Sequence, residues 1–135
     1  MSTISPFLRR VLLADALISG ATGLFMAIGA GFLADLLDLP EGLLREAGLV
    51  LLPYAVFVGY VATRAQLKRP LVWAIIVANA LWALDSIVLL VSGWIAPNAF
   101  GYAFLIVQAV VVALLAELQY TGLRRQALVV AAGSR

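Results

Sequence analysis

Residues 71–94 read LVWAIIVANALWALDSIVLLVSGW, and this run contains a single ionisable side chain, Asp85. A helix crosses the hydrocarbon core of a membrane, about 30 Å thick, with about 20 predominantly apolar residues. The run is therefore long and apolar enough to span a bilayer. Runs of the same kind occupy residues 11–33, 43–63 and 99–119. Together they predict four membrane-spanning helices.

The composition of the whole chain agrees with lipid as its solvent. Of its 135 residues, 64% are hydrophobic and 12% are charged, and the mean hydropathy is +1.09. A water-soluble domain carries about 25% charged residues, so this chain has too few charges to cover a water-facing surface. Short connections between the runs favour antiparallel neighbours. We predict an all-α fold with a single domain, residues 1–135, that forms an integral membrane four-helix bundle running up, down, up and down.

Lys and Arg are distributed unevenly about the four runs. Of the nine, only Arg45 lies where the first run leads into the second, and the others lie at the opposite end. Cytoplasmic loops are enriched in Lys and Arg, so both termini are expected in the cytoplasm, with residues 120–135 as a short cytoplasmic tail. The excess of Arg over Lys favours a GC-rich bacterial genome, and we expect a multi-pass protein of the bacterial cytoplasmic (inner) membrane. The cytoplasmic residues are Arg9, Arg10, Arg64, Lys68, Arg69, Arg124, Arg125 and Arg135.

Small residues recur at every fourth position along the first run and again in the second. Such ridges let two helix backbones approach closely, which is how helices associate in lipid. The partner helix belongs either to the same chain or to a second copy, and the sequence leaves both open. Pro53 removes a backbone donor near the middle of the second run and is expected to bend that helix. The predicted packing residues are Ser19, Gly23, Ala27 and Gly31 in one ridge and Ala55 and Gly59 in the other.

Polar side chains inside the runs are the candidate binding residues, because each costs a few kcal/mol in hydrocarbon unless it is paired or neutral. Asp85 is the strongest candidate, since it lies in the outer half of the hydrocarbon with no cation of the runs at its depth. It is expected to be protonated, to hydrogen-bond Gln108 or Tyr54, or to pair with Arg45. A proton or cation site and a hydrogen-bonded tie between helices both remain open. The candidates for ligand or proton binding are Asp85, Asn79, Gln108, Tyr54, Trp82 and Asp15.

Two further groups of polar residues have expected partners. Helical spacing places Asn79 and Trp82 on one face of the third helix, which is expected to look into the bundle and to meet Gln108. Asp15 and Glu117 lie close to the cytoplasmic boundary of their runs. Each is expected to form an ion pair with a nearby arginine by extending toward the interface. For Asp15 the expected partners are Arg10, Arg64 and Arg69.

Several function classes are excluded by what the sequence lacks. The chain holds no Cys and no His, so its own side chains form no disulfide, thiolate cluster or imidazole ligand. No Gly-rich phosphate loop, metal-ligand constellation or Ser/His/Asp set occurs. We predict no catalytic residues, no metal site and no cofactor, and a protein that is not an enzyme. Because the basic residues flank apolar runs, the expected partner is the lipid bilayer and not nucleic acid.

The placement of Arg10, Ser19-Gly20, Glu46 and Arg64 resembles that in DoxX-like small four-helix membrane proteins. In that family an Arg precedes the first helix, a Ser-Gly pair lies in its middle, an acidic residue opens the second helix and an Arg closes it. The resemblance covers roughly the first half of the chain. It implies an accessory subunit near quinone or redox partners, with no cofactor of its own.

Two functions are compatible with these features. The first is a non-enzymatic accessory or scaffold subunit, which associates through its helices as a homo-oligomer or within a larger membrane complex. The alternative is a small carrier or binding protein for a cation or an apolar ligand. In that alternative Asp85, Asn79 and Gln108 form the site, beside the helix that bends at Pro53.

Overall fold

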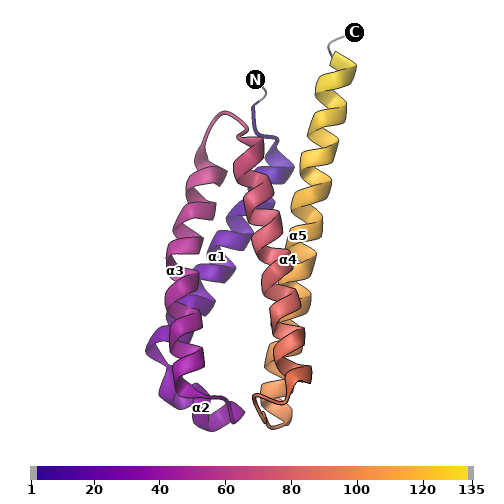
Figure 1. Cartoon of the computed structure of the whole chain (residues 1–135). Helices are drawn as coiled ribbons and strands as arrows, with labels where there is room; N and C mark the ends of the chain where they lie inside the picture. The colour runs from indigo at the N-terminus through magenta and orange to yellow at the C-terminus, as the bar shows by residue number, and fades with distance from the viewer. Residues whose placement is uncertain (1–2, 134–135) are drawn as a thin grey trace.

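The computed structural model describes residues 3–133, and within them the chain forms five α-helices (Figure 1). α1 covers Pro6–Ile28, α2 Ala30–Leu37, α3 Glu41–Thr63, α4 Arg69–Ser92 and α5 Ala99–Gly133. All except the short α2 are long and apolar enough to cross a membrane. The predicted all-α, four-helix membrane bundle is therefore confirmed.

The first spanning helix lies earlier in the chain than the apolar run 11–33 predicts. Ser5 caps it, because its hydroxyl oxygen accepts a hydrogen bond from the Leu8 N–H at 3.2 Å. Pro6 occupies the first turn, where a helix needs no backbone donor. α1 ends before Gly29, whose N–H bonds to the Phe25 carbonyl, and the remainder of the run forms α2. Apolar side chains outline the segment that lipid covers, whereas capping groups set where a helix begins.

The last helix continues well past residue 119, the predicted end of the fourth run. Its 35 residues make a rod about 52 Å long, which exceeds the hydrocarbon thickness of about 30 Å. Most of the expected tail, residues 120–135, is therefore helix, and residues 134 and 135 lie outside the described part of the chain. Gln126 on this extension accepts a hydrogen bond from the Ser5 N–H and donates one to the Thr3 carbonyl. These bonds tie the start of the chain to α5.

The four long helices form two pairs. α1 packs along α3, and α4 packs along α5, whereas the backbones of α3 and α4 approach each other at few points. The α1/α3 pair and the α4/α5 pair converge at the end that holds both termini and separate toward α2 (Figure 1). One apolar core, which includes Leu8, Val58 and Ile75, fills the convergent end, and a second, which includes Leu37 and Leu44, surrounds α2. The second core also lines the cavities of the candidate site, through residues such as Leu37 and Leu44.

Within the first pair, the closest approach lies where Gly23 faces Gly48. A Cβ atom added to Gly48 would lie 2.6 Å from the Ala27 nitrogen and 2.7 Å from the Gly23 carbonyl oxygen. Neither backbone atom has room to move aside. Gly20 continues the contact against Ala55. Such close packing supplies the dispersion energy that holds helices together in lipid.

The other predicted packing residues lie at different places along the same pair. Ser19 is buried on α1. Gly59 of α3 lies near Ala16 of α1. Gly31 belongs to α2, where a Cβ would lie 3.3 Å from a carboxylate oxygen of Glu41. The ridge that the sequence shows as one row is thus divided by the helix break at Gly29.

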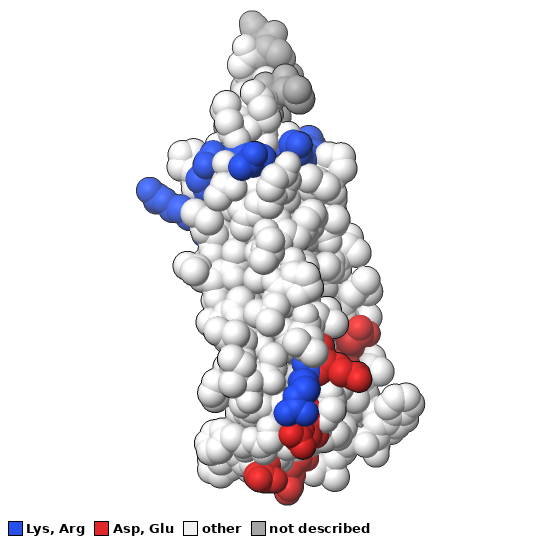
Figure 2. Space-filling model, turned by 90° about the vertical axis from the view of Figure 1, so that its left-hand side faces the viewer, with Lys and Arg blue, Asp and Glu red and all other residues white. Residues whose placement is uncertain are grey.

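Charged residues mark the two ends of the bundle. Figure 2 shows Lys and Arg in a band near the end that holds the termini, and Asp and Glu toward the other end. The first end, called the basic end here, carries Arg9, Arg10, Arg64, Lys68, Arg69, Arg124 and Arg125. The opposite, acidic end carries Asp35, Asp38, Glu41 and Glu46 with one cation, Arg45. The exposed surface between them is mostly apolar, as a lipid-facing surface requires.

The Gly23–Gly48 contact gives a first prediction. Gly48→Ala forces α1 and α3 apart, and we expect the free energy of unfolding to fall by about 1–3 kcal/mol. The measurement is the thermal unfolding midpoint of the purified protein in one detergent. Gly42→Ala is the matched control on the same helix, because a Cβ there has nothing within 4 Å. Equal midpoints for the two variants would contradict the close contact.

Candidate functional site

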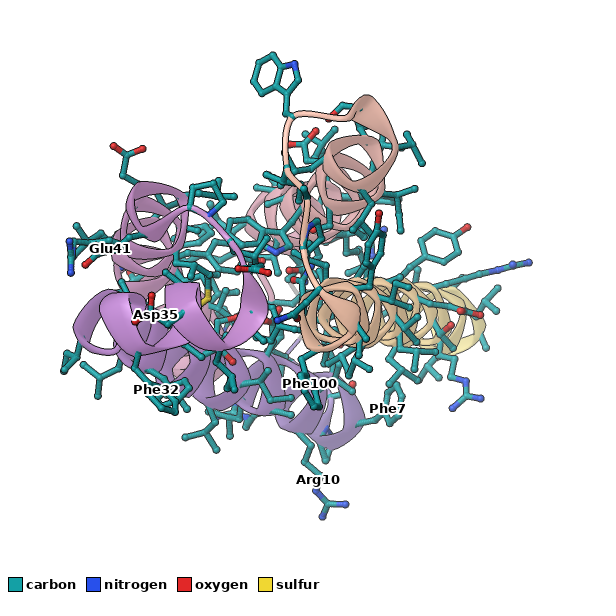
Figure 3. The ribbon with its side chains drawn as sticks, turned by 90° about the horizontal axis from the view of Figure 1, so that it is seen from below. Phe7, Arg10, Phe32, Asp35, Glu41 and Phe100 are labelled. Atoms are coloured by element: carbon teal, nitrogen blue, oxygen red, sulfur yellow. The ribbon has the colours of Figure 1, made fainter. Side chains whose placement is uncertain are left out.

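A cavity of about 630 Å³ lies between the α1/α3 pair and the α4/α5 pair, and is called the large cavity here. Most of its wall is apolar, with Leu51 from α3 and Val107 from α5 as examples. In the view from the acidic end, Phe100 at the start of α5 lies between the α1 and α5 ribbons (Figure 3). The large cavity thus occupies the space that opens where the two pairs separate.

A second cavity of about 220 Å³, the small cavity, adjoins the first. The two share lining residues from all four long helices, so they lie side by side. The small cavity adds Asp85 and Ser86 of α4 to the wall. The shared residues are Thr22, Leu51, Trp82, Phe104 and Gln108.

A buried hydrogen-bonded group, the Asp15 cluster, connects all four long helices. It consists of Asp15 and Ser19 from α1, Tyr54 from α3, Asn79 from α4 and Gln119 from α5. One Asp15 oxygen accepts from the Ser19 hydroxyl at 2.9 Å. The other accepts from the Asn79 amide at 2.8 Å and from the Gln119 amide at 2.7 Å.

The outer members of the Asp15 cluster complete its bonding. The Asn79 amide also donates to the Gln119 side-chain oxygen at 3.0 Å. The Tyr54 hydroxyl donates to the Asn79 side-chain oxygen at 2.9 Å and lies 3.3 Å from the Ile75 carbonyl. No buried side-chain nitrogen or oxygen of residues 3–133 lacks a partner. Ser19, Tyr54 and Asn79 also line the large cavity, so the cluster forms its polar floor.

The prediction that Asp15 forms an ion pair with an arginine is wrong. Asp15 is 1% exposed and bonds to neutral side chains, and within the described residues the recorded ion pair is Arg45–Glu41 at 3.0 Å. Arg10, an expected partner, points away from the bundle (Figure 3). Glu117, for which a similar pair was expected, is exposed. The reason for Asp15 is geometric: its side chain faces the interior of the bundle, where amide donors lie, and cannot extend to the interface.

A second hydrogen-bonded chain lines both cavities. The Trp82 indole N–H donates to the Gln108 side-chain oxygen at 2.8 Å, and the Gln108 amide donates to the Ser86 hydroxyl oxygen at 2.7 Å. Asn79 and Trp82 do look into the bundle, as their helical spacing indicates. Gln108 meets this face as expected, through Trp82 and Ser86, whereas Asn79 bonds to Gln119. Gln108 and Gln119 of α5 therefore form hydrogen bonds at different depths in the bundle.

Asp85 forms none of the contacts expected from the sequence. Within the part of the chain that the structure describes, no hydrogen bond or ion pair reaches its carboxylate. Gln108 and Tyr54 have other partners, and Arg45 is paired with Glu41. The Asp85 side chain is exposed and forms part of the small-cavity wall. It is therefore available to a molecule that enters from the membrane.

Gln119 is the member of the site that the sequence analysis missed. It is the final residue of the predicted fourth run. A polar residue is common at such a position because it lies at the membrane interface. A signal was present in its spacing, because Gln108 and Gln119 are three helical turns apart and share a face, and Gln126 continues that face. A row of amides on one face of a membrane helix indicates a side that packs against protein.

The described part of the site holds neither a metal-ligand group nor a pair of facing carboxylates. No group of three or more His, Cys, Asp or Glu residues that could hold a metal ion occurs within residues 3–133. Asp15 and Asp85 do not share a hydrogen bond or a cavity wall. What the site offers is apolar volume with hydroxyl, amide, indole and carboxylate groups at defined places, which is typical of a small-molecule pocket.

The Asp15 cluster predicts a difference between Asp15 and Asp85. Asp15→Ala leaves the Gln119 amide without its acceptor and removes one of the two acceptors of the Asn79 amide, and we expect a loss of about 1–3 kcal/mol in the free energy of unfolding. Asp85→Ala removes the same atoms from an unbonded side chain and is the control, with a change within about 0.5 kcal/mol. Thermal unfolding in detergent measures both. A larger loss in the Asp85 variant would contradict this assignment.

Comparison of the chain with protein families, with curated proteins and with solved structures finds no match. The resemblance to DoxX-like proteins therefore stays a prediction. The functional conclusion below depends on the cavity and its polar groups alone.

Proposed function

We propose that the chain is a membrane binding protein, or small carrier, for an apolar, lipid-like molecule. The observation that supports this proposal is the large cavity, whose volume of about 630 Å³ falls within the range of about 300–1,000 Å³ that is usual for small-molecule sites. Its lining is mostly apolar, with a few polar groups that can orient a ligand. This is the composition that such sites share.

The arrangement of the helices supports entry from the membrane. Most of the lining residues lie between the basic and acidic ends, at the level of the bilayer. The backbones of α3 and α4 approach each other at few points, and we propose that the ligand enters through this seam between the helix pairs. An apolar molecule dissolved in the bilayer can pass through such a seam without crossing water. The site then takes its ligand sideways, from the phase in which the ligand is already concentrated.

Polar groups on the cavity wall give the ligand an orientation. Thr22 lines both cavities, and its hydroxyl has no hydrogen bond within the described residues. The Tyr54 oxygen and the Gln108 side-chain oxygen each keep a lone pair beyond their recorded bonds. A ligand with one polar group and an apolar body fits this distribution.

The first expectation from sequence, a non-enzymatic accessory or scaffold subunit, depends on what the chain lacks. The cavity is a positive feature, and it favours the binding function over a purely structural one. The two are compatible if the ligand is passed to a larger complex. The binding function is the one that a purified chain can test.

We also propose that the chain lies in a bacterial cytoplasmic membrane with both termini in the cytoplasm. The band of Lys and Arg at the basic end (Figure 2) supports this orientation. Because the chain has no Cys, single cysteines report sidedness directly. We expect Asp38→Cys to react with a membrane-impermeant maleimide in intact cells or spheroplasts, and Lys68→Cys to react only after permeabilisation. The reverse pattern would overturn the proposed orientation.

The binding proposal predicts that filling the large cavity blocks the ligand. Trp73→Phe with Trp94→Phe leaves Trp82, which lines both cavities, as the single fluorophore. In lipid nanodiscs, a brominated long-chain alcohol is expected to quench Trp82 in a saturable manner. Ala103→Phe adds a ring to the cavity wall, and we expect binding to weaken about tenfold or more, since overpacking costs about 1–3 kcal/mol.

The control for this experiment is Ala113→Phe, which adds the same ring to an exposed position of α5 that lines neither cavity. It should leave the quenching curve unchanged. Quenching that never saturates, with the same slope in all three proteins, would mean that the probe reaches Trp82 only from bulk lipid. That result would overturn the proposed function.

A further inference from the structure

We propose that the ligand carries a protonated amine, and that Asp85 binds this amine in the small cavity while the apolar part of the ligand occupies the large cavity. The chain would then recognise cationic amphiphiles. This inference rests on the proposed function and names its ligand class.

The first step is the depth of Asp85 in the membrane. α4 has 24 residues and is about 36 Å long, and Asp85 lies two turns, about 10 Å, before its end at Ser92. This places the carboxylate inside the hydrocarbon layer, in the half nearer to the acidic end. An unpaired charge in a membrane helix costs about 2.5–3.5 kcal/mol at the centre on insertion scales. A partner for Asp85 therefore offsets part of this insertion cost.

The second step is that the described chain supplies no such partner. Arg45, the one cation of the acidic end, is paired with Glu41. The other described cations lie at the basic end (Figure 2). Asp15, in contrast, has its oxygens filled by Ser19, Asn79 and Gln119, and lies beneath the cavity floor. Of these two acids, Asp85 is the one with free acceptor atoms at a cavity.

The third step is the composition of the small cavity. Trp82 and Phe104 share its wall with Asp85, and aromatic faces attract cations through their quadrupole. The carboxylate supplies charge and hydrogen-bond acceptors for an N–H group. An anionic head group would be repelled by Asp85. Carboxylate and aromatic rings around a volume of about 220 Å³ match an ammonium group.

The fourth step is that the small cavity adjoins the large cavity. Trp82 and Phe104 line both spaces, so a head group at Asp85 lies next to the larger volume. That volume is mostly apolar and suits an alkyl chain or a ring system. A ligand with the amine at one end and the apolar body at the other satisfies both spaces at once.

The experiment compares two brominated amphiphiles that share one alkyl chain, a primary alkylamine and the corresponding alcohol. The amine is protonated at neutral pH. Trp82 is again the single fluorophore, in nanodiscs of phosphatidylcholine. We expect the amine to bind about tenfold more tightly than the alcohol, since a charge-assisted hydrogen bond is worth more than a neutral one. Asp85→Asn should remove this preference, so that the amine binds with about the same affinity as the alcohol.

Glu117→Gln is the matched control, because Glu117 is also an exposed carboxylate within a spanning helix but lines neither cavity. It should keep the preference for the amine. The unfolding midpoint of Asp85→Asn should equal that of the parent, which separates recognition from folding. Adding phosphatidylethanolamine to the nanodiscs distinguishes two sources of the amine. Displacement of the probe by this lipid would identify a lipid head group as the source of the amine. Absence of displacement would identify a free amphiphile as the source. Both results support amine recognition.

The remaining outcomes separate this inference from the proposed function. Saturable binding of both probes with equal affinity would overturn amine recognition and leave the apolar site in place. A preference for the amine that survives Asp85→Asn would overturn the role of Asp85. Absence of saturable binding for either probe would overturn the proposed function and this inference together.

Discussion

The hydrogen bonds that Asp15 accepts from Asn79 and Gln119 connect the two helix pairs across the middle of the bundle. Lipid offers polar side chains no partners, so a polar group inside the membrane has to find them within the protein. Asp15 belongs to the α1/α3 pair, and both amides belong to the α4/α5 pair. The cluster therefore fixes where the pairs meet, and the large cavity begins where these contacts end.

Two kinds of contact hold the helices of this bundle together. Within the α1/α3 pair, Gly23 and Gly48 allow the backbones to touch, and Gly20 and Gly59 extend this contact along the pair. Between the pairs, directional hydrogen bonds hold the helices at a distance set by side-chain length. Bulky residues such as Trp82 and Phe104 occupy the space beyond the cluster without closing it. A bundle packed throughout by small residues would leave no room for a ligand.

The sequence predicted the spans well because hydropathy and charge act on each helix separately. It could place Asp15 and Asp85 by depth, but a partner also depends on how each helix is rotated, which is set by contacts such as Gly23–Gly48. For that reason the predicted arginine partner of Asp15 was wrong. Gln119 was missed because α5 extends past its apolar run. The cavity arises from side chains of several helices, and no single helix carries a signal for it.

Asp15 and Asp85 show why two acids in the same membrane need different explanations. Asp15 has three donors from the chain itself, so the fold alone accounts for its presence. Asp85 gains nothing from the described fold and carries the cost of a carboxylate in hydrocarbon. A residue that carries this insertion cost and lines a cavity is explained most simply by what it binds there. The proposed amine ligand supplies hydrogen-bond donors to Asp85, as Asn79 and Gln119 do to Asp15. Binding of the ligand would therefore also provide the partner that the Asp85 carboxylate needs inside the membrane.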